Sequence, residues 1–158
     1  MGWRDSMLEK SESQAIEFTS SLIPTGEAII ARAFAATKPK GGGPSSLPDF
    51  SNALGVGLAV GDLISAARTL AEAKALFITV TDRSVVICHR RYSGLGKWEH
   101  GLTLPRESVR VVKFKKGMLN TVLKLSAAGV EIDMLTGNWA PKASKYADLG
   151  VLNSALSA

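Results

Sequence analysis

The sequence predicts an α+β fold, an antiparallel bent sheet or half-open barrel of about seven strands flanked by helices, and three features lead to this prediction. The length of 158 residues fits one domain, since typical domains hold about 100–150 residues. The segment 75–137 is rich in β-branched residues and is divided by turn residues about every 10 positions, as in antiparallel barrels. Helical patterns stand near both ends, at 5–22 and 141–157.

The first helix is expected over residues 5–22. Apolar and charged residues recur there at roughly helical spacing, and Ser6 and Glu9 have the spacing of a capping box. The apolar side would consist of Met7, Leu8, Ala15, Phe18 and Leu22, and the polar side of Glu9, Lys10, Glu12, Gln14 and Glu17. Pro24 and Gly26 then end the helix.

Residues 27–37 are expected to form the first strand, which is followed by an insertion over 38–74. Its first part, 38–52, contains three prolines and three glycines and is expected to be a loop. Its second part, 53–74, has an apolar and a polar side and is expected to be a helix. This helix carries three small residues that would let another backbone approach closely, either that of its own sheet or that of a partner: Gly55, Gly57 and Gly61.

Six further strands are expected in the β core, 75–137. The first two surround Asp82 and Arg83 as a hairpin, and Pro105 ends a later strand. The six strands are predicted at 76–81, 84–89, 98–104, 109–115, 119–126 and 130–135. A C-terminal helix at 141–157 would turn an inner face made of Ala143, Tyr146, Leu149, Leu152 and Leu156 toward the sheet.

The net charge of +5 is unevenly distributed along the chain. Residues 83–124 hold ten bases and two acids, a balance of +8, whereas the first 36 residues have a balance of −2. This asymmetry indicates an anionic partner such as a membrane surface, and the alternative is a solvated basic face without a partner. The candidate residues for an anionic partner are Arg83, Arg90, Arg91, Lys97, Lys113, Lys115 and Lys116.

The residues that could perform catalysis are few. Cys88 and His89 are adjacent, so in a strand their side chains point to opposite faces and cannot form a nucleophilic pair. We expect Cys88 in the core and His100 in solvent, and no residues show metal-ligand spacing. We therefore expect a protein that is not an enzyme and needs no metal or cofactor. The single cysteine fits a reducing compartment, and no apolar run reaches the ~20 residues that span a bilayer. The expected location is the cytoplasm, with peripheral attachment to a membrane as an option.

Several segments, taken in order, resemble bacterial pleckstrin-homology-like (PH-like, GRAM-related) domains. Residues 75–88 resemble the hairpin of these domains, which contains a Thr-Asp pair, and 104–109 resemble the strand that begins with an aliphatic residue and a proline. Residues 115–125 are similar to the hairpin that begins with Lys-Gly, and 130–134 to the strand before the closing helix. Residues 22–30 resemble the opening Gly-Glu strand.

The resemblance implies a seven-stranded bent sheet whose end is plugged by the C-terminal helix, in a binding module that is not an enzyme. In eukaryotic relatives the loop between the first two strands binds phosphoinositides, but here the insertion 38–74 replaces this loop and the lipid pattern is absent. Three hypotheses follow. The first is an adaptor for a protein or an anionic membrane surface. The second is a self-assembling component, a homo-oligomer that uses helix 53–74. The third is a nucleic-acid binder that stacks bases on Tyr92, Trp98 and Phe114.

Overall fold

A computed structural model of the chain describes residues 3–37, 73, 75–90, 97–127, 130–138 and 146–157. The elements are α1 (Trp3–Ser20), β1 (Ile29–Thr37), β2 (Ala75–Thr81), β3 (Ser84–Arg90), β4 (Glu99–Pro105), η3 (Arg106–Ser108), β5 (Val109–Lys116), β6 (Asn120–Ala127), β7 (Val130–Gly137) and α4 (Leu149–Ser157). The predicted loop 38–52 and, apart from Ala73, the predicted helix 53–74 lie outside the described residues.

The seven strands form one antiparallel sheet in the order β4-β3-β2-β1-β7-β6-β5. The predicted α+β class, the seven strands, the bend and the two terminal helices are thus confirmed. The strands begin and end within two residues of the predicted positions. Around Asp82 and Arg83, Thr81 Oγ1 accepts hydrogen bonds from the backbone N–H groups of Arg83 and Ser84, at 3.2 and 2.8 Å, which closes the predicted hairpin.

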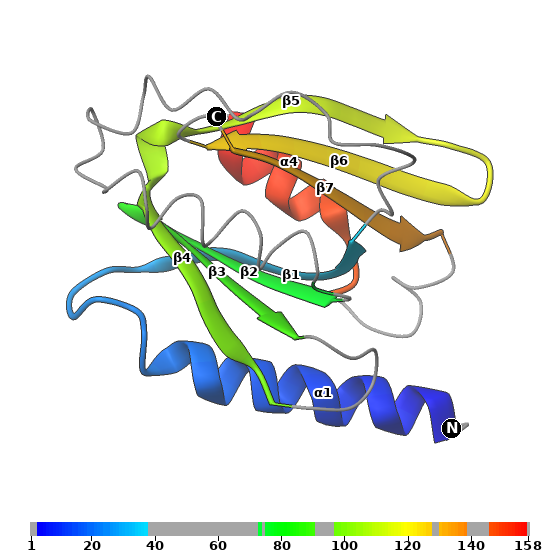
Figure 1. Cartoon of the computed structure of the whole chain (residues 1–158), viewed down its shortest axis with the longest axis horizontal. Coiled ribbons are helices and arrows are strands. Elements are labelled where there is room, and N and C mark those ends of the chain that lie inside the picture. Colours follow the sequence, from blue (N-terminus) through cyan, green and yellow to red (C-terminus); the bar gives the residue numbers. More distant parts are fainter. Residues whose placement is uncertain are drawn as a thin grey trace.

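The sheet bends at β1, which divides it into two halves (Figure 1). Strand β1 pairs with β2 along most of its length, but it pairs with β7 only through Ala36 opposite Leu135 and Thr37 opposite Met134. Helix α4 lies inside the bend and packs against β1, β2, β5 and β6. Leu149 and Leu152 of α4 join the aliphatic side chains of both halves in one buried cluster. The C-terminal helix therefore closes the concave side of the sheet.

The C-terminal helix is shorter than expected. Residues 141–145 lie outside the described part, and residues 146–148 form a turn, so α4 begins at Leu149. Asp148 sets this start, because its Oδ1 accepts a hydrogen bond from the backbone N–H of Gly150 at 2.9 Å and caps the first turn. The carbonyl of Tyr146 accepts a hydrogen bond from the backbone N–H of Phe34 at 2.7 Å, which anchors this turn to β1.

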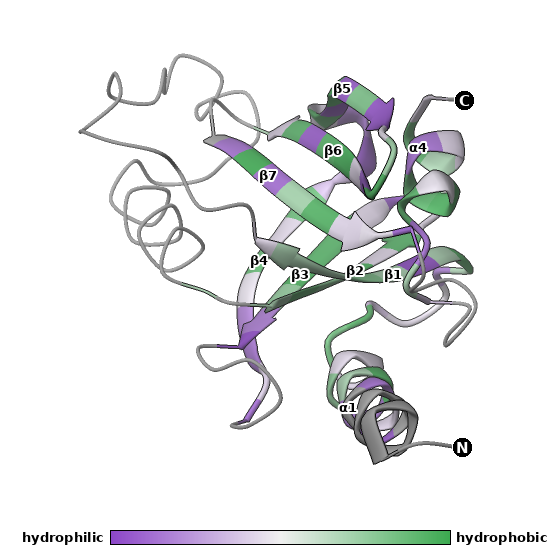
Figure 2. Cartoon of the chain, turned by 90° about the vertical axis from the view of Figure 1, so that its right-hand side faces the viewer, coloured by the Kyte–Doolittle hydropathy of each residue, from purple (hydrophilic) through white to green (hydrophobic). Residues whose placement is uncertain are grey.

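Helix α1 covers the outer face of the half formed by β1–β4 (Figure 2). Ala15 of α1 is buried in a second cluster with Phe77 and Cys88, and Trp98 closes its edge. The expected polar side of this helix requires one correction, because Glu12 is only 6% exposed. The helix lies on the sheet rather than in solvent, so its buried face is wider than the apolar stripe alone. In the part of the chain that the structure describes, no helix combines the length and apolarity needed to cross a bilayer.

Candidate functional site

The structure separates the seven candidate bases into different environments. Lys113, Lys115 and Lys116 are exposed on β5. Lys97 is exposed just before β4, and Arg83 is exposed in the β2–β3 turn, with Nε 4.0 Å from Asp82 Oδ2. Arg91 lies outside the described residues, and so does the candidate assembly face of Gly55, Gly57 and Gly61.

Arg90 does not belong to the basic surface, which corrects the expectation from the sequence. Its side chain is 2% exposed, and its guanidinium lies 4.7 Å from the centre of the Trp98 ring and 5.8 Å from that of Phe34. Such stacking on aromatic rings stabilises a cation that is removed from water. Burial lowers the pKa of Arg90, which nevertheless stays a cation at neutral pH. The sequence shows that Arg90 is charged, but it does not show that the side chain is buried.

The aromatic residues do not form the expected stacking platform for bases. Trp98 is buried and meets the rings of Phe34 and Phe77 edge to face, at 5.8 and 6.1 Å between ring centres. Phe114 lies on β5, in the other half of the sheet, and Tyr92 lies outside the described residues. Trp98 and Phe114 therefore cannot stack on neighbouring bases of one strand of nucleic acid.

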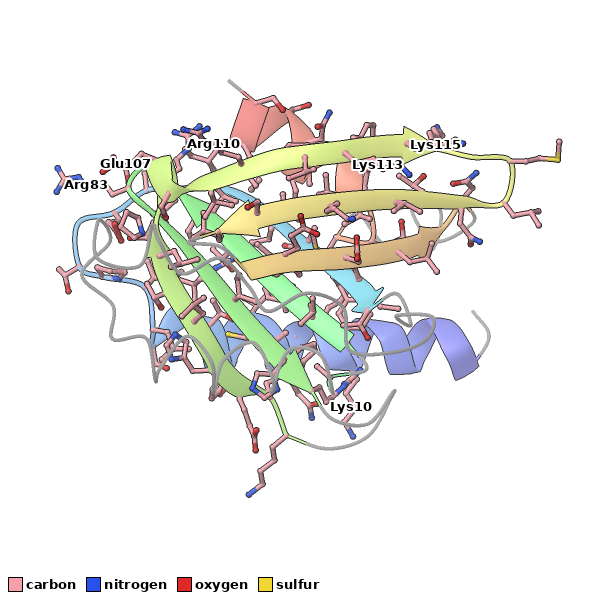
Figure 3. All side chains as sticks on the ribbon, turned by 45° about the horizontal axis from the view of Figure 1, so that its top comes forward. Lys10, Arg83, Glu107, Arg110, Lys113 and Lys115 are labelled. Carbon is pink, nitrogen blue, oxygen red and sulfur yellow. The ribbon has the colours of Figure 1, made fainter. Side chains whose placement is uncertain are left out.

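The described bases that do gather lie on β5, and a β-bulge brings them to one face. The register shifts between Val111 and Lys113, so that Val112 is the additional residue. Without this shift, the two-residue period of a strand would put Arg110 on the face opposite to Lys113 and Lys115. With it, these three bases stand opposite Ser126, Lys124 and Val122, which share the outer face of β6. Figure 3 shows Arg110, Lys113 and Lys115 in line along β5.

The positive charge is concentrated at β5 because the next base is neutralised. Lys124 of β6 lies opposite Lys113, but its Nζ is 3.6 Å from Glu131 Oε2 and 3.8 Å from Asp133 Oδ1 on β7. No acidic residue occurs between Glu107 and Glu131 in the sequence. We define the basic strip as Arg110, Lys113 and Lys115 on the outer face of β5, together with the exposed Lys116 at the end of the strand.

Exposed apolar side chains accompany the basic strip. Met118 and Leu119, in the turn between β5 and β6, are 94% and 75% exposed, and Val112 and Phe114 on β5 are partly exposed. The hairpin reaches beyond α4 and the end of β7 (Figure 1), and hydrophilic and hydrophobic bands alternate on its strands (Figure 2). Sequence reasoning identified the turn after Lys116 but missed this apolar pair. The signal was present in the order Lys-Lys-Gly-Met-Leu, because apolar residues are unusual in a turn.

The titratable residues of β3 lie on opposite faces, as the sequence predicts. Cys88 faces α1, with Sγ 3.6 Å from Thr19 Oγ1, and burial raises the pKa of its thiol. Nε2 of His89 is 3.9 Å from Glu99 Oε2, and burial lowers the pKa of the imidazole, although Glu99 partly opposes this shift. His100 is exposed, as expected. In the described ranges, no three His, Cys, Asp or Glu side chains are placed to hold a metal ion.

Comparison with known proteins assigns no family to the chain. No family model matches it, and neither a curated protein nor a solved structure matches it. The basic strip and the hairpin that carries it are therefore the candidate functional site.

Proposed function

We propose that the chain is a PH-like binding module that docks on an anionic membrane surface through the basic strip. The observation that carries this proposal is the bulge at Val112, which aligns Arg110, Lys113 and Lys115 on one exposed face with no acid on the same strand. A row of cations on an exposed strand attracts a surface of negative charge.

The arrangement of the strands supports the PH-like part of the proposal. The single bent sheet of seven strands and the C-terminal helix packed against it are features that the resemblance implies. The expected phosphoinositide loop is not part of the proposal, because its lysine/arginine pattern is absent between the first two strands. The attraction assigned to β5 is for negative charge in general and not for one headgroup.

The expected strength is moderate and depends on salt. Each base near an anionic membrane contributes about 1 kcal/mol, so the four bases of the basic strip together contribute about 4 kcal/mol. This free energy corresponds to roughly a thousandfold in partitioning, and it falls when salt screens the charges. The exposed apolar residues beside the strip favour a membrane over a nucleic acid, because apolar side chains gain from the bilayer interface and not from the phosphates that dominate non-specific nucleic-acid binding.

Sedimentation with vesicles tests the proposal. The wild-type chain is expected to pellet with vesicles that contain phosphatidylserine, less so at high salt, and to stay in the supernatant with phosphatidylcholine vesicles. The triple variant Lys113→Gln, Lys115→Gln, Lys116→Gln should lose this binding. The matched control removes three exposed bases elsewhere, through Lys10→Gln, Arg83→Gln and Lys97→Gln, and should keep it.

The control also separates the alternatives. Equal loss in both triple variants would mean that total charge, and not the strip, drives binding. If wild-type chain fails to pellet with anionic vesicles at low salt, the membrane proposal is wrong. Filter binding of RNA and DNA under the same conditions would then decide for or against the nucleic-acid hypothesis, and light scattering of the chain in solution would decide the self-assembly hypothesis.

A further inference from the structure

The turn between β5 and β6 has a second property that the basic strip does not explain. We propose that Met118 and Leu119 enter the interfacial region of the lipid bilayer, with Asn138 supplying hydrogen bonds to the backbone of the turn. This inference rests on the proposed membrane function, and it adds the depth and the orientation of the docked chain. The hairpin would place its tip in the bilayer while the outer face of β5 behind it lies over the headgroups.

The two side chains are placed where insertion requires them. Among the exposed large hydrophobic residues of the described ranges, Met118 and Leu119 have the highest exposed fractions. They follow Lys115 and Lys116 along the hairpin, with only Gly117 between the two pairs. In interfacial membrane segments, apolar side chains lie at the acyl boundary while lysines extend their ammonium groups back to the headgroups. The turn has this order of apolar tip and basic flank.

The backbone of a turn is the obstacle to insertion, because carbonyl groups without partners are unfavourable in a medium without water. Here three successive carbonyls have partners from one residue. Asn138 Nδ2 donates to the carbonyl oxygens of Gly117 at 2.8 Å and Met118 at 3.1 Å. The backbone N–H of Asn138 donates to the carbonyl oxygen of Leu119 at 2.9 Å. The carbonyls of the turn are therefore directed at the protein while its apolar side chains point outward.

Two further contacts hold this arrangement in place. Thr121 Oγ1 donates to Asn138 Oδ1 at 2.8 Å, which fixes the orientation of the amide. The backbone N–H of Gly117 donates to the carbonyl of Asn120 at 2.8 Å, and a Cβ at Gly117 would lie only 3.0 Å from that same oxygen. Glycine is thus needed for the close approach.

The hydrogen bonds that Asn138 makes to the turn indicate a role beyond the stability of the turn in water. Carbonyls in an exposed turn can bond to water without any protein partner. Hydrogen bonds from the protein to three of these carbonyls matter most when the turn is transferred out of water. The exposed residues beside these carbonyls are a methionine and a leucine, which favour such a transfer. Asn138 is therefore a positioning residue for the tip.

A probe at the tip measures insertion directly. Cys88 is the single cysteine of the chain and is buried, so Met118→Cys can be labelled with a polarity-sensitive fluorophore in the folded protein. On binding to phosphatidylserine vesicles, the label should shift to shorter wavelength and be quenched by lipids with a nitroxide on the upper acyl chain. The matched control is a label at Arg83→Cys, at the end of the molecule remote from Lys115 (Figure 3), which should stay in water.

Variants at the tip test its contribution without changing charge. Met118→Ser with Leu119→Ser should weaken partitioning by about tenfold to a hundredfold, since two apolar side chains no longer leave water. Asn138→Ala should reduce the quenching of the label at position 118, whereas Thr121→Val keeps the bonds to the three carbonyls and should reduce it less. Thermal unfolding in solution checks that each variant is folded.

The outcomes distinguish this inference from the proposed function. If the label at position 118 stays in water on bound vesicles, or if the double serine variant binds as wild type, tip insertion is wrong. The basic strip would still stand as long as the triple glutamine variant lost binding. If that variant bound normally while the label at position 118 was quenched, the electrostatic proposal would fail and insertion would stand. An Asn138→Ala chain that is folded and still inserts to full depth would refute the positioning role.

Discussion

The two halves of the bent sheet differ in how many of their faces are covered. In β2 every residue is buried, and in β3 only Ser84 is not, because α1 covers one face and the aliphatic core covers the other. In β6 buried and partly exposed residues alternate, and in β5 only Val109 is buried. The first half therefore holds much of the packing, and the second half is free to present side chains to a partner.

The difference can be traced to the residues of the strands. Strand β2 contains the apolar run Leu76-Phe77-Ile78, and such a run is stable only when both faces leave water. Strand β6 alternates apolar and polar residues, as a strand with one solvated face does. A substitution in the first half should therefore change stability, and one on β5 should change binding.

The largest effect is expected for Phe77→Ala. This ring is fully buried between Trp98 and Tyr146, and its removal should lower the free energy of unfolding by about 3–5 kcal/mol. Phe114→Ala on β5 is the matched control and should lower it by less than about 1 kcal/mol, because that ring is partly exposed. Urea denaturation measures both. Similar losses for the two variants would contradict the contrast between the halves.

The next largest effect is expected for Arg90→Ala. The guanidinium lies against Trp98 and Phe34, so its removal leaves a gap beneath α1 and should lower the free energy of unfolding by about 2–3 kcal/mol. Binding to anionic vesicles should remain within about twofold of wild type, since this cation does not reach the surface. Vesicle sedimentation of the folded variant checks the second statement, and a strong loss there would return Arg90 to the binding surface.

Arg90 also shows what the sequence could not predict. The positions of the strands, their antiparallel character and both terminal helices were predicted from periodicity and turn residues, because these signals are local. Arg90, Lys113 and Lys115 belong to one basic segment of the sequence, but Arg90 is buried against Trp98 and Phe34, whereas the two lysines are exposed on β5. Asn138 follows the last strand, and its contacts to residues 117–119 depend on β7 pairing with β6. Such long-range contacts leave no local pattern.

A smaller effect is expected from the pH. Burial lowers the pKa of His89, His100 adds to this shift, and the carboxylate of Glu99 partly opposes it. The unfolded chain therefore binds this proton more readily than the folded chain. Stability should be full above the ordinary histidine pKa of about 6.5 and should fall as the pH drops below it toward the folded-state pKa. His89→Gln should flatten this part of a stability curve measured by urea denaturation, and an unchanged slope would show that His89 titrates normally.

The smallest effect is expected for deletion of Val112, which tests how the basic strip is aligned. Without this residue β5 reads Val-Arg-Val-Lys-Phe-Lys-Lys, a strict alternation that keeps Arg110, Lys113 and Lys115 on the outer face. The register with β6 then needs no bulge, and vesicle binding should stay within about twofold of wild type. If this deletion strongly weakened binding in folded protein, the common face of the three bases would not be what attracts the membrane.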